Sequence, residues 1–178
     1  MIDSPWPHPV KLAQVSRLAA GEKLERRLVA GEAARTAVAE LLEVEAVERL
    51  EAGLWLSPWF DGMQIEGRWR AAVVQVCGVS LEPFQVDLDG RFMVRAVPEG
   101  SALAPREGEE IVVDPDADDP PDVVEGDSVD LGGYVVEHLA LEIDPFPRKP
   151  GAAFVQPGQP AESSPFDVLR ALKDHKPT

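Results

Sequence analysis

Cysteine is almost absent from this chain. Cys77 is the single one in 178 residues, so no intramolecular disulfide framework can form. No apolar run approaches the roughly 18 residues that a membrane-spanning helix needs. The first nine residues hold three prolines and lack the basic segment and apolar run of a signal peptide. These absences predict a protein of the reducing cytoplasm without a membrane partner, and residues 1–9 are expected to form a loose arm.

Basic residues are also scarce. The chain has 17 Lys and Arg against 32 Asp and Glu, a formal net charge of −15, and a pI near 4.5. Nucleic-acid affinity comes largely from clustered Lys and Arg, so this balance argues against a general polyanion binder. It fits a basic partner, or simply a soluble protein. The apolar content of 44 % is ordinary for a globular chain and allows a hydrophobic core.

The clearest pattern is an alternation of apolar and polar residues over residues 63–96. From Met63 to Leu81 the odd positions are mostly apolar, and from Phe84 to Ala96 the even positions are. Period two indicates strands, because successive side chains point to opposite faces. The parity changes at Glu82-Pro83, where proline cannot donate to a ladder. We therefore expect two long antiparallel strands that meet at this corner and share one apolar face.

Shorter patterns flank this hairpin. Helical spacing of Ala34, Ala37, Val38 and Leu41 predicts a helix that starts after Gly31. A second helix is expected over about 129–141, with Ser128 as its N-cap and Asp130 in its first turn. Strands are expected over 10–15, 24–30 and 44–56, with a turn at 57–62. The predicted fold is α+β, with a mostly antiparallel β-sheet and a long bent hairpin packed by two or three helices.

A change of composition marks the last part of the predicted domain. Acidic residues and prolines accumulate after Glu107, with no Lys or Arg before Asp130. This composition predicts a mobile acidic loop at about 100–127, interrupted at most by a strand at 111–113. We expect one domain over 1–148, a Pro/Gly-rich linker over 149–163, and a short helix with a tail over 164–178.

Metal chemistry is a weak match to this chain. Five carboxylates fit the spacing of a calcium loop, but the position that should be glycine is Asp119, and Pro120-Pro121 interrupts the turn. These carboxylates are Asp114, Asp116, Asp118, Asp122 and Glu125. Cys77 has no second cysteine, and the histidines lie far apart in sequence, so it is interpreted as a core thiol. A divalent-metal-dependent enzyme that uses the acidic loop stays the alternative function.

Four arginines point away from the apolar face of the predicted hairpin, namely Arg68, Arg70, Arg91 and Arg95. If residues 81–83 form the turn, Arg70 and Arg95 nearly face each other. Like charges at opposite positions cost stability unless an anion bridges them. That anion is either an RNA phosphate or the protein's own acidic loop. A plainly solvated sheet face is the third possibility.

Four motifs stand in an order and spacing that resemble the YceD family, also called the large ribosomal RNA subunit accumulation protein family. They are Val76-Cys-Gly-Val-Ser-Leu-Glu-Pro-Phe84, Val129-Asp-Leu-Gly-Gly-Tyr-Val-Val-Glu-His-Leu-Ala-Leu141, Ile143-Asp-Pro-Phe-Pro147 and Ser164-Pro-Phe-Asp-Val-Leu-Arg-Ala-Leu-Lys173. Ser80 stands where many relatives carry a second cysteine, and Val79 where they often carry an arginine. Any zinc or redox role of such cysteine pairs cannot operate in this chain.

The resemblance implies a bacterial, cytoplasmic, non-enzymatic factor for 23S ribosomal RNA accumulation or processing and large-subunit assembly. Its partner would be a basic ribosomal protein or 23S rRNA in the pre-50S particle, without a cofactor, metal or small-molecule substrate. A generic protein-interaction module is a further alternative. The expected contact surface combines the corner, the second helix and the basic residues: Glu82, Pro83, Phe84, Asp130, Glu137, Arg68, Arg70, Arg91, Arg95, Arg148 and Lys149.

Overall fold

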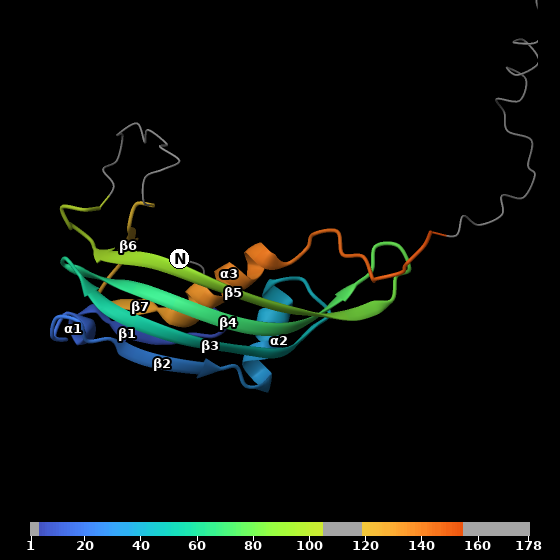
Figure 1. The fold of residues 1–178 in the computed structure, drawn as a ribbon, viewed down its shortest axis with the longest axis horizontal. Coiled ribbons are helices and arrows are strands. Elements are labelled where there is room, and N and C mark those ends of the chain that lie inside the picture. The colour runs from blue at the N-terminus through green and yellow to red at the C-terminus, as the bar shows by residue number, and fades with distance from the viewer. Residues whose placement is uncertain (1–3, 105–118, 155–178) are drawn as a thin grey trace, which may run out of the picture.

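The computed structural model describes residues 4–104 and 119–154. Their main element is a five-stranded sheet in the order β2-β3-β4-β5-β6, antiparallel except for the parallel pair β5-β6 (Figure 1). A two-stranded sheet, β1-β7, forms a second layer. The strands are β1 (Pro9–Lys11), β2 (Leu24–Val29), β3 (Ala46–Trp59), β4 (Gly62–Val76), β5 (Pro83–Pro98), β6 (Asp122–Val124) and β7 (Ser128–Asp130). The helices are α1 (Leu12–Val15), α2 (Glu32–Leu41) and α3 (Leu131–Glu142).

The alternating stretch forms the long hairpin that its period predicts. Met63, Ile65 and Trp69 of β4 are at most 2 % exposed, and the arginines on either side of Trp69 are exposed. On β5 the opposite parity buries Phe92 and Ala96. The predicted α+β fold with a mostly antiparallel sheet is therefore confirmed.

The predicted corner of the hairpin was misplaced. The last cross-strand pair is Val76 with Pro83, so residues 77–82 form the connection, and the Leu81 N–H donates to the Cys77 carbonyl (2.9 Å). Leu81 itself takes the left-handed conformation, with φ +58°. Because the turn lies nearer the N-terminus than expected, every pair along the hairpin shifts.

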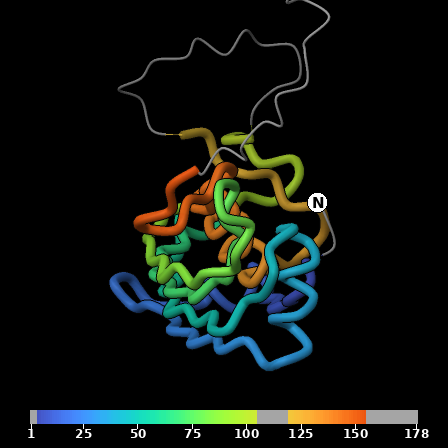
Figure 2. The backbone as a smooth tube through the Cα atoms, turned by 90° about the vertical axis from the view of Figure 1, so that its right-hand side faces the viewer, coloured from blue at the N-terminus to red at the C-terminus, as the bar shows by residue number. Residues whose placement is uncertain are grey.

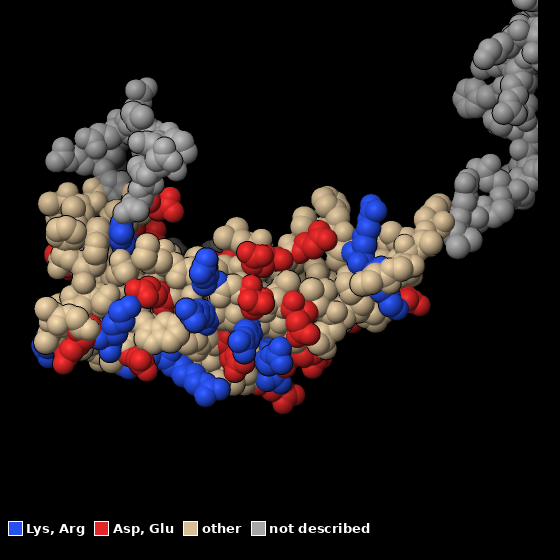
Figure 3. Space-filling view, in the orientation of Figure 1, with Lys and Arg blue, Asp and Glu red and all other residues tan. Residues whose placement is uncertain are grey.

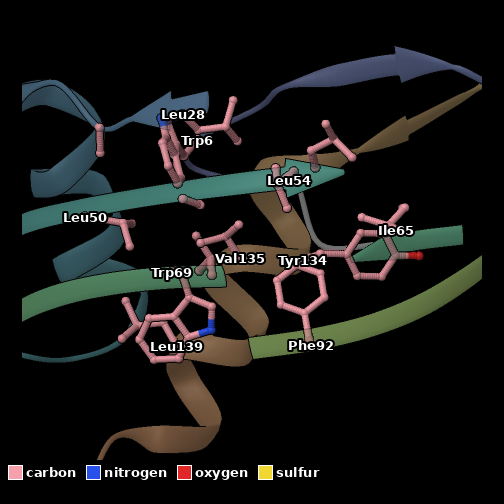
Figure 4. Packing of buried hydrophobic residues seen from close by; sticks show 14 of the residues in the cluster. Trp6, Leu28, Leu50, Leu54, Ile65, Trp69, Phe92, Tyr134, Val135 and Leu139 are labelled. Carbon is pink, nitrogen blue, oxygen red and sulfur yellow. The ribbon is translucent and has the colours of Figure 1, made fainter. Parts of the chain in front are cut away.

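One face of the sheet is covered by α3, which crosses behind β4 and β5 (Figure 1). Leu131, Val135 and Leu139 are completely buried against the strands. The Tyr134 ring lies 6.5 Å from the Phe92 ring in the same cluster (Figure 4). We call this the inner face of the sheet, and burying a side chain such as Leu139 contributes about 1.5–3 kcal/mol.

Two glycines leave the space that inner-face aromatics fill. Gly67 lies opposite Phe92, and Gly90 lies opposite Trp69. A Cβ atom on Gly67 would stand 2.4 Å from the Phe92 ring, and one on Gly90 would stand 2.6 Å from the Trp69 ring. Each ring thus packs directly over the backbone of the neighbouring strand, and any larger residue would displace it.

The N-terminal segment is ordered from residue 4, so the expected loose arm is wrong for this part. Trp6 is only 5 % exposed, because its indole enters the core cluster. Residues 12–15 form α1 rather than the end of a strand. Residues 1–3 lie outside the described residues.

Asp130, not Ser128, caps α3. Its Oδ1 accepts from the Gly132 N–H (3.1 Å) and from the His8 N–H (2.6 Å). Residues 128–130 are held in β7 by β1, so the helix begins only at Leu131. The N-terminal arm therefore fixes the start of the helix that covers the core.

The predicted acidic loop contains a strand that the sequence did not indicate. β6 pairs with the end of β5, and Val124 is 1 % exposed. The Tyr134 hydroxyl donates to Asp122 Oδ2 (2.7 Å), so β6 is also tied to α3. Burial, followed by this hydrogen bond, raises the pKa of Tyr134. The strand expected at 111–113 and the terminal helix expected at 164–178 lie outside the described residues.

Candidate functional site

The face of the sheet opposite α3, which we call the outer face, carries a row of arginines. Cross-strand pairing places Arg27 of β2, Gly53 of β3, Arg68 of β4 and Arg91 of β5 side by side. Figure 3 shows Lys and Arg gathering near the middle of this face among scattered Asp and Glu. Neighbouring strands lie about 4.8 Å apart, so this row brings positive charge from separate strands into close range.

Several carboxylates on the outer face have partners of their own. Glu66 accepts from Lys23 Nζ (2.8 Å), Arg27 pairs with Glu51 (3.7 Å), and Arg49 pairs with Asp87 (3.1 Å). Glu25 accepts from the Trp55 indole N–H (3.2 Å). The hydrogen bond from Lys23 is the main cause that lowers the pKa of Glu66. These contacts reduce the negative charge that is left to neutralise the central arginines.

Arg68, Arg70 and Arg91 are exposed cations. Within the described part of the chain, no carboxylate lies within 4.0 Å of their guanidinium groups. Arg68 and Arg91 are directly opposite in the register. Such residues have Cβ atoms about 4.5–5.5 Å apart, and two like charges in these positions destabilise the sheet. The outer face therefore holds two facing positive charges without a close ion pair, and Glu66 beside Arg68 offsets them only in part.

This arrangement corrects the predicted arginine pairing. Arg70 lies opposite Asp89, and Arg95 lies opposite Gln64, so the expected pair of Arg70 with Arg95 is wrong. Arg95 instead places its guanidinium 5.1 Å from the Trp59 ring. The physical cause is the position of the β4-β5 turn, which lies nearer the N-terminus than predicted. The shifted register places Arg68, rather than Arg70, opposite an arginine.

Trp55 lies beside the arginine pair. Its indole is half-buried, and the guanidinium of Arg68 lies 5.9 Å from the ring centroid. Trp55, Arg68 and Arg91 together line two shallow hollows on the outer face, with volumes of about 1070 Å³ and 730 Å³. The outer face thus presents guanidinium groups and an aromatic ring in open depressions rather than a closed pocket. Carboxylates also line these hollows, among them Glu25, Glu51 and Asp89 in the larger one and Glu66 in the smaller one.

A second group of predicted residues meets at the tip of the hairpin. Lys149 Nζ binds Glu82 (2.8 Å), and the Gly78 N–H donates to the Pro147 carbonyl (2.9 Å). Figure 2 shows the chain after α3 lying beside the connection between β4 and β5. Gln75 anchors this segment by donating to the Asp144 carbonyl (2.9 Å), a role that the sequence did not indicate. Arg148 and Pro83 are exposed, and Phe84 is half-buried.

Cys77 is fully buried at this tip, as the core-thiol interpretation predicted. Its Sγ accepts from the backbone N–H groups of Val79, Ser80 and Lys149 at 3.3–3.4 Å. Hydrogen bonds from Ser80, with its side chain first, lower the pKa of Cys77 from about 9 to about 6. The thiol therefore closes the loop as a hydrogen-bond acceptor, a setting that its position in the sequence did not reveal.

The structure does not bring the predicted contact residues of α3, or the candidate metal ligands that it describes, into one site. Asp130 caps α3, and Glu137 is exposed on that helix away from the arginine row. Asp114, Asp116 and Asp118 lie outside the described residues, and Asp122 is engaged by Tyr134. Across residues 4–104 and 119–154, no cluster of three or more His, Cys, Asp or Glu side chains has the geometry to hold a metal ion.

The YceD family model, described as large ribosomal RNA subunit accumulation protein YceD, matches residues 65–173. The chain belongs to this family. The YceD match spans more than half of the 178 residues and includes most of β4 and all of β5 and α3. No curated protein and no solved structure shows a significant match. Of the helices that the structure describes, none is long and apolar enough to cross a membrane.

Sequence reasoning missed Arg27, Gly53 and Trp55, which complete the outer face. Arg27 and Gly53 lie in the row of Arg68, and Trp55 lies two pairs further along β3. A usable signal was present, because the position of the two-residue turn Phe60-Asp61 fixes the β3-β4 register as far as the irregularity between Val47 and Arg49. The YceD match begins at residue 65, so β2 and β3 contribute from outside the matched part.

Proposed function

We propose that this YceD-family protein is a non-enzymatic factor that supports 23S rRNA accumulation by binding RNA of the assembling large subunit on its outer face. The observation that carries the proposal is the Arg68–Arg91 pair, two exposed cations at opposite positions that form no ion pair within 4.0 Å among the described residues. A phosphate that binds between the two guanidinium groups would attract both of them and offset their mutual repulsion.

The overall negative charge of the protein favours RNA binding at one small surface over attraction of RNA to the whole protein. At −15 the whole protein repels polyanions at long range, so binding must depend on a small cationic surface. Arginine suits this task, because its planar guanidinium binds phosphate oxygens in a bidentate manner. The family description, which refers to accumulation of ribosomal RNA, makes RNA the natural source of the phosphate.

The experiment compares Arg68→Gln/Arg91→Gln with Arg148→Gln in a strain that lacks the gene. Arg148 is exposed at the tip, and therefore controls for loss of positive charge elsewhere. The double variant should fail to restore the ratio of 23S to 16S rRNA and of 50S to 30S particles, whereas Arg148→Gln should restore both. Equal rescue by the two variants, at matched protein levels, would refute the role of the outer face.

A binding measurement supplies the physical counterpart. Each phosphate contact to a single strand contributes about −0.7 to the slope of log affinity against log salt concentration. Loss of both arginines should therefore weaken binding to a 23S fragment and reduce the magnitude of that slope by about 1.4, compared with no change for Arg148→Gln. An unchanged slope would mean that these arginines do not contact phosphate.

Binding of a basic ribosomal protein is the second candidate function. The net charge of −15 favours it, because an acidic protein attracts a cationic partner. A pull-down from ribosome-depleted extract at low and high salt separates the candidates. Capture of one basic ribosomal protein by Arg68→Gln/Arg91→Gln as well as by the wild type would favour this candidate over RNA.

A further inference from the structure

We infer that the outer face selects single-stranded RNA, with an unpaired base stacked on Trp55 and the adjoining phosphate held by Arg68 and Arg91. This inference rests on the proposed function, and it adds the form of RNA and the residue that recognises it. The arginine pair alone would accept phosphate from any nucleic acid. Trp55 is the feature that distinguishes an unpaired strand from a duplex.

The indole of Trp55 is held in place before any ligand arrives. Its N–H donates to Glu25 Oε1 (3.2 Å), which fixes one edge of the ring. At the other edge, the ring atom Cη2 lies 3.4 Å from the position that a Cβ of Gly53 would occupy. Glycine at 53 thus lets the ring approach the sheet closely. A ring that is already oriented loses little conformational entropy when a base stacks on it.

The indole and the two arginines are close enough to serve one nucleotide. Gly53 lies opposite Arg68, and Trp55 is two residues along β3 on the same face. The Arg68 guanidinium lies over the indole, 5.9 Å from the ring centroid, so a base that stacks on this side must share the ring with Arg68. Arg91 is the direct cross-strand neighbour of Arg68. All three residues line both hollows, so a base and its phosphate can be accommodated next to each other.

Stacking on Trp55 requires a base whose face is accessible. In a duplex each base face is covered by neighbouring base pairs, whereas a single strand can offer its bases to aromatic side chains. An exposed face of a sheet with an aromatic ring among cations is the kind of surface that binds single strands with little sequence preference. We therefore expect the site to take unpaired segments of ribosomal RNA.

The test uses the purified full chain and a 16-nucleotide RNA without self-structure, either alone or annealed to its complement. The wild type should bind the single strand at least about 10-fold more tightly than the duplex. Trp55→Ala should weaken single-strand binding by about 5- to 150-fold, the range expected for one stacked base. Trp55→Phe keeps an aromatic ring and should stay within about 3-fold of the wild type.

Two further readouts distinguish a loss of base stacking from a loss of phosphate contacts and from misfolding of the variant. The salt slope should be the same in Trp55→Ala and the wild type, because no phosphate contact is lost. RNA should quench the indole fluorescence of the wild type, and Trp55→Phe should remove most of this quenching while it still binds. This second readout keeps the test decisive if thermal unfolding shows that Trp55→Ala is poorly folded.

The outcomes distinguish this inference from the proposed function. If duplex and single strand bind equally, or if Trp55→Ala binds as the wild type does, stacking is overturned while RNA binding stands. If the wild type binds neither form of RNA, the proposed function fails together with the inference. A preference for the single strand that disappears in Trp55→Ala and is restored in Trp55→Phe supports both.

Discussion

Replacing Arg91 by glutamine should stabilise the folded protein while it weakens RNA binding. Arg91 lies opposite Arg68, and no carboxylate of the described chain pairs with either guanidinium. Arg91→Gln removes the repulsion and retains a long polar side chain on the strand. Arg68 is the less suitable position to change, because it also contacts Trp55.

The size of the effect follows from the position of the pair. Directly opposite charges on a sheet contribute roughly 0.2–1 kcal/mol, with the unfavourable sign for like charges. For a chain of this length, that corresponds to a rise in Tm of about 0.5–4 °C. Both side chains are exposed, so salt should screen the repulsion, with a Debye length of about 30 Å at 0.01 M and about 3 Å at 1 M.

Thermal or urea unfolding at 0.01 M and 1 M NaCl measures this prediction, with Arg49→Gln as the matched control. Arg49 lies on β3 and pairs with Asp87 of β5, so the same substitution there should destabilise the protein at low salt. Opposite signs for the two variants at low salt, converging at 1 M, are expected. A loss of stability in Arg91→Gln at 0.01 M would refute the claim that repulsion between Arg68 and Arg91 destabilises the folded protein.

Three other predictions concern the fold. Gly90→Ala should lower the free energy of unfolding by about 1–3 kcal/mol, because a Cβ there would displace the Trp69 ring, and urea unfolding measures this loss. Asp130→Ala should lower the free energy of unfolding by about 1–2 kcal/mol in the same assay, because it removes the N-cap of α3 and the acceptor for the His8 N–H. A loss below about 0.3 kcal/mol would contradict this role of Asp130. Cys77 should titrate near pH 6, seen as thiolate absorbance at 240 nm, and its pKa should rise in Ser80→Ala. Because the pKa of the folded thiol is below the ordinary value near 9, the stability that Cys77 contributes should rise from pH 6 to pH 9, and should be lost as the pH falls through 6. The variant Cys77→Ser should lack this dependence.

Sequence periodicity predicted the elements whose burial is one-sided. β4, β5, α2 and α3 each bury one face or stripe, so apolar spacing located them to within a few residues. β6 was missed because it is three residues long and carries only one fully buried side chain, Val124. Trp6 was missed for a related reason, since a single buried residue in a proline-rich segment produces no period.

The candidate site could be predicted in composition but not in geometry. Parity placed Arg68 and Arg91 on the solvent face, which is where they lie. Their juxtaposition depends on the register, and the register depends on a loop in which Leu81 takes a left-handed conformation unusual for a residue other than glycine. The contribution of Trp55 needed the β3-β4 register, which depends on the exact position of the turn at Phe60-Asp61.

Crosslinking of the purified protein to 23S rRNA fragments, with the attached peptides mapped by mass spectrometry, tests most directly where RNA lies on this molecule. We predict crosslinks on β3, β4 and β5, at or beside Trp55, Arg68 and Arg91, and their loss in Arg68→Gln/Arg91→Gln. Crosslinks confined to the hairpin tip, around residues 77–83 and 144–152, would contradict an RNA site on the outer face.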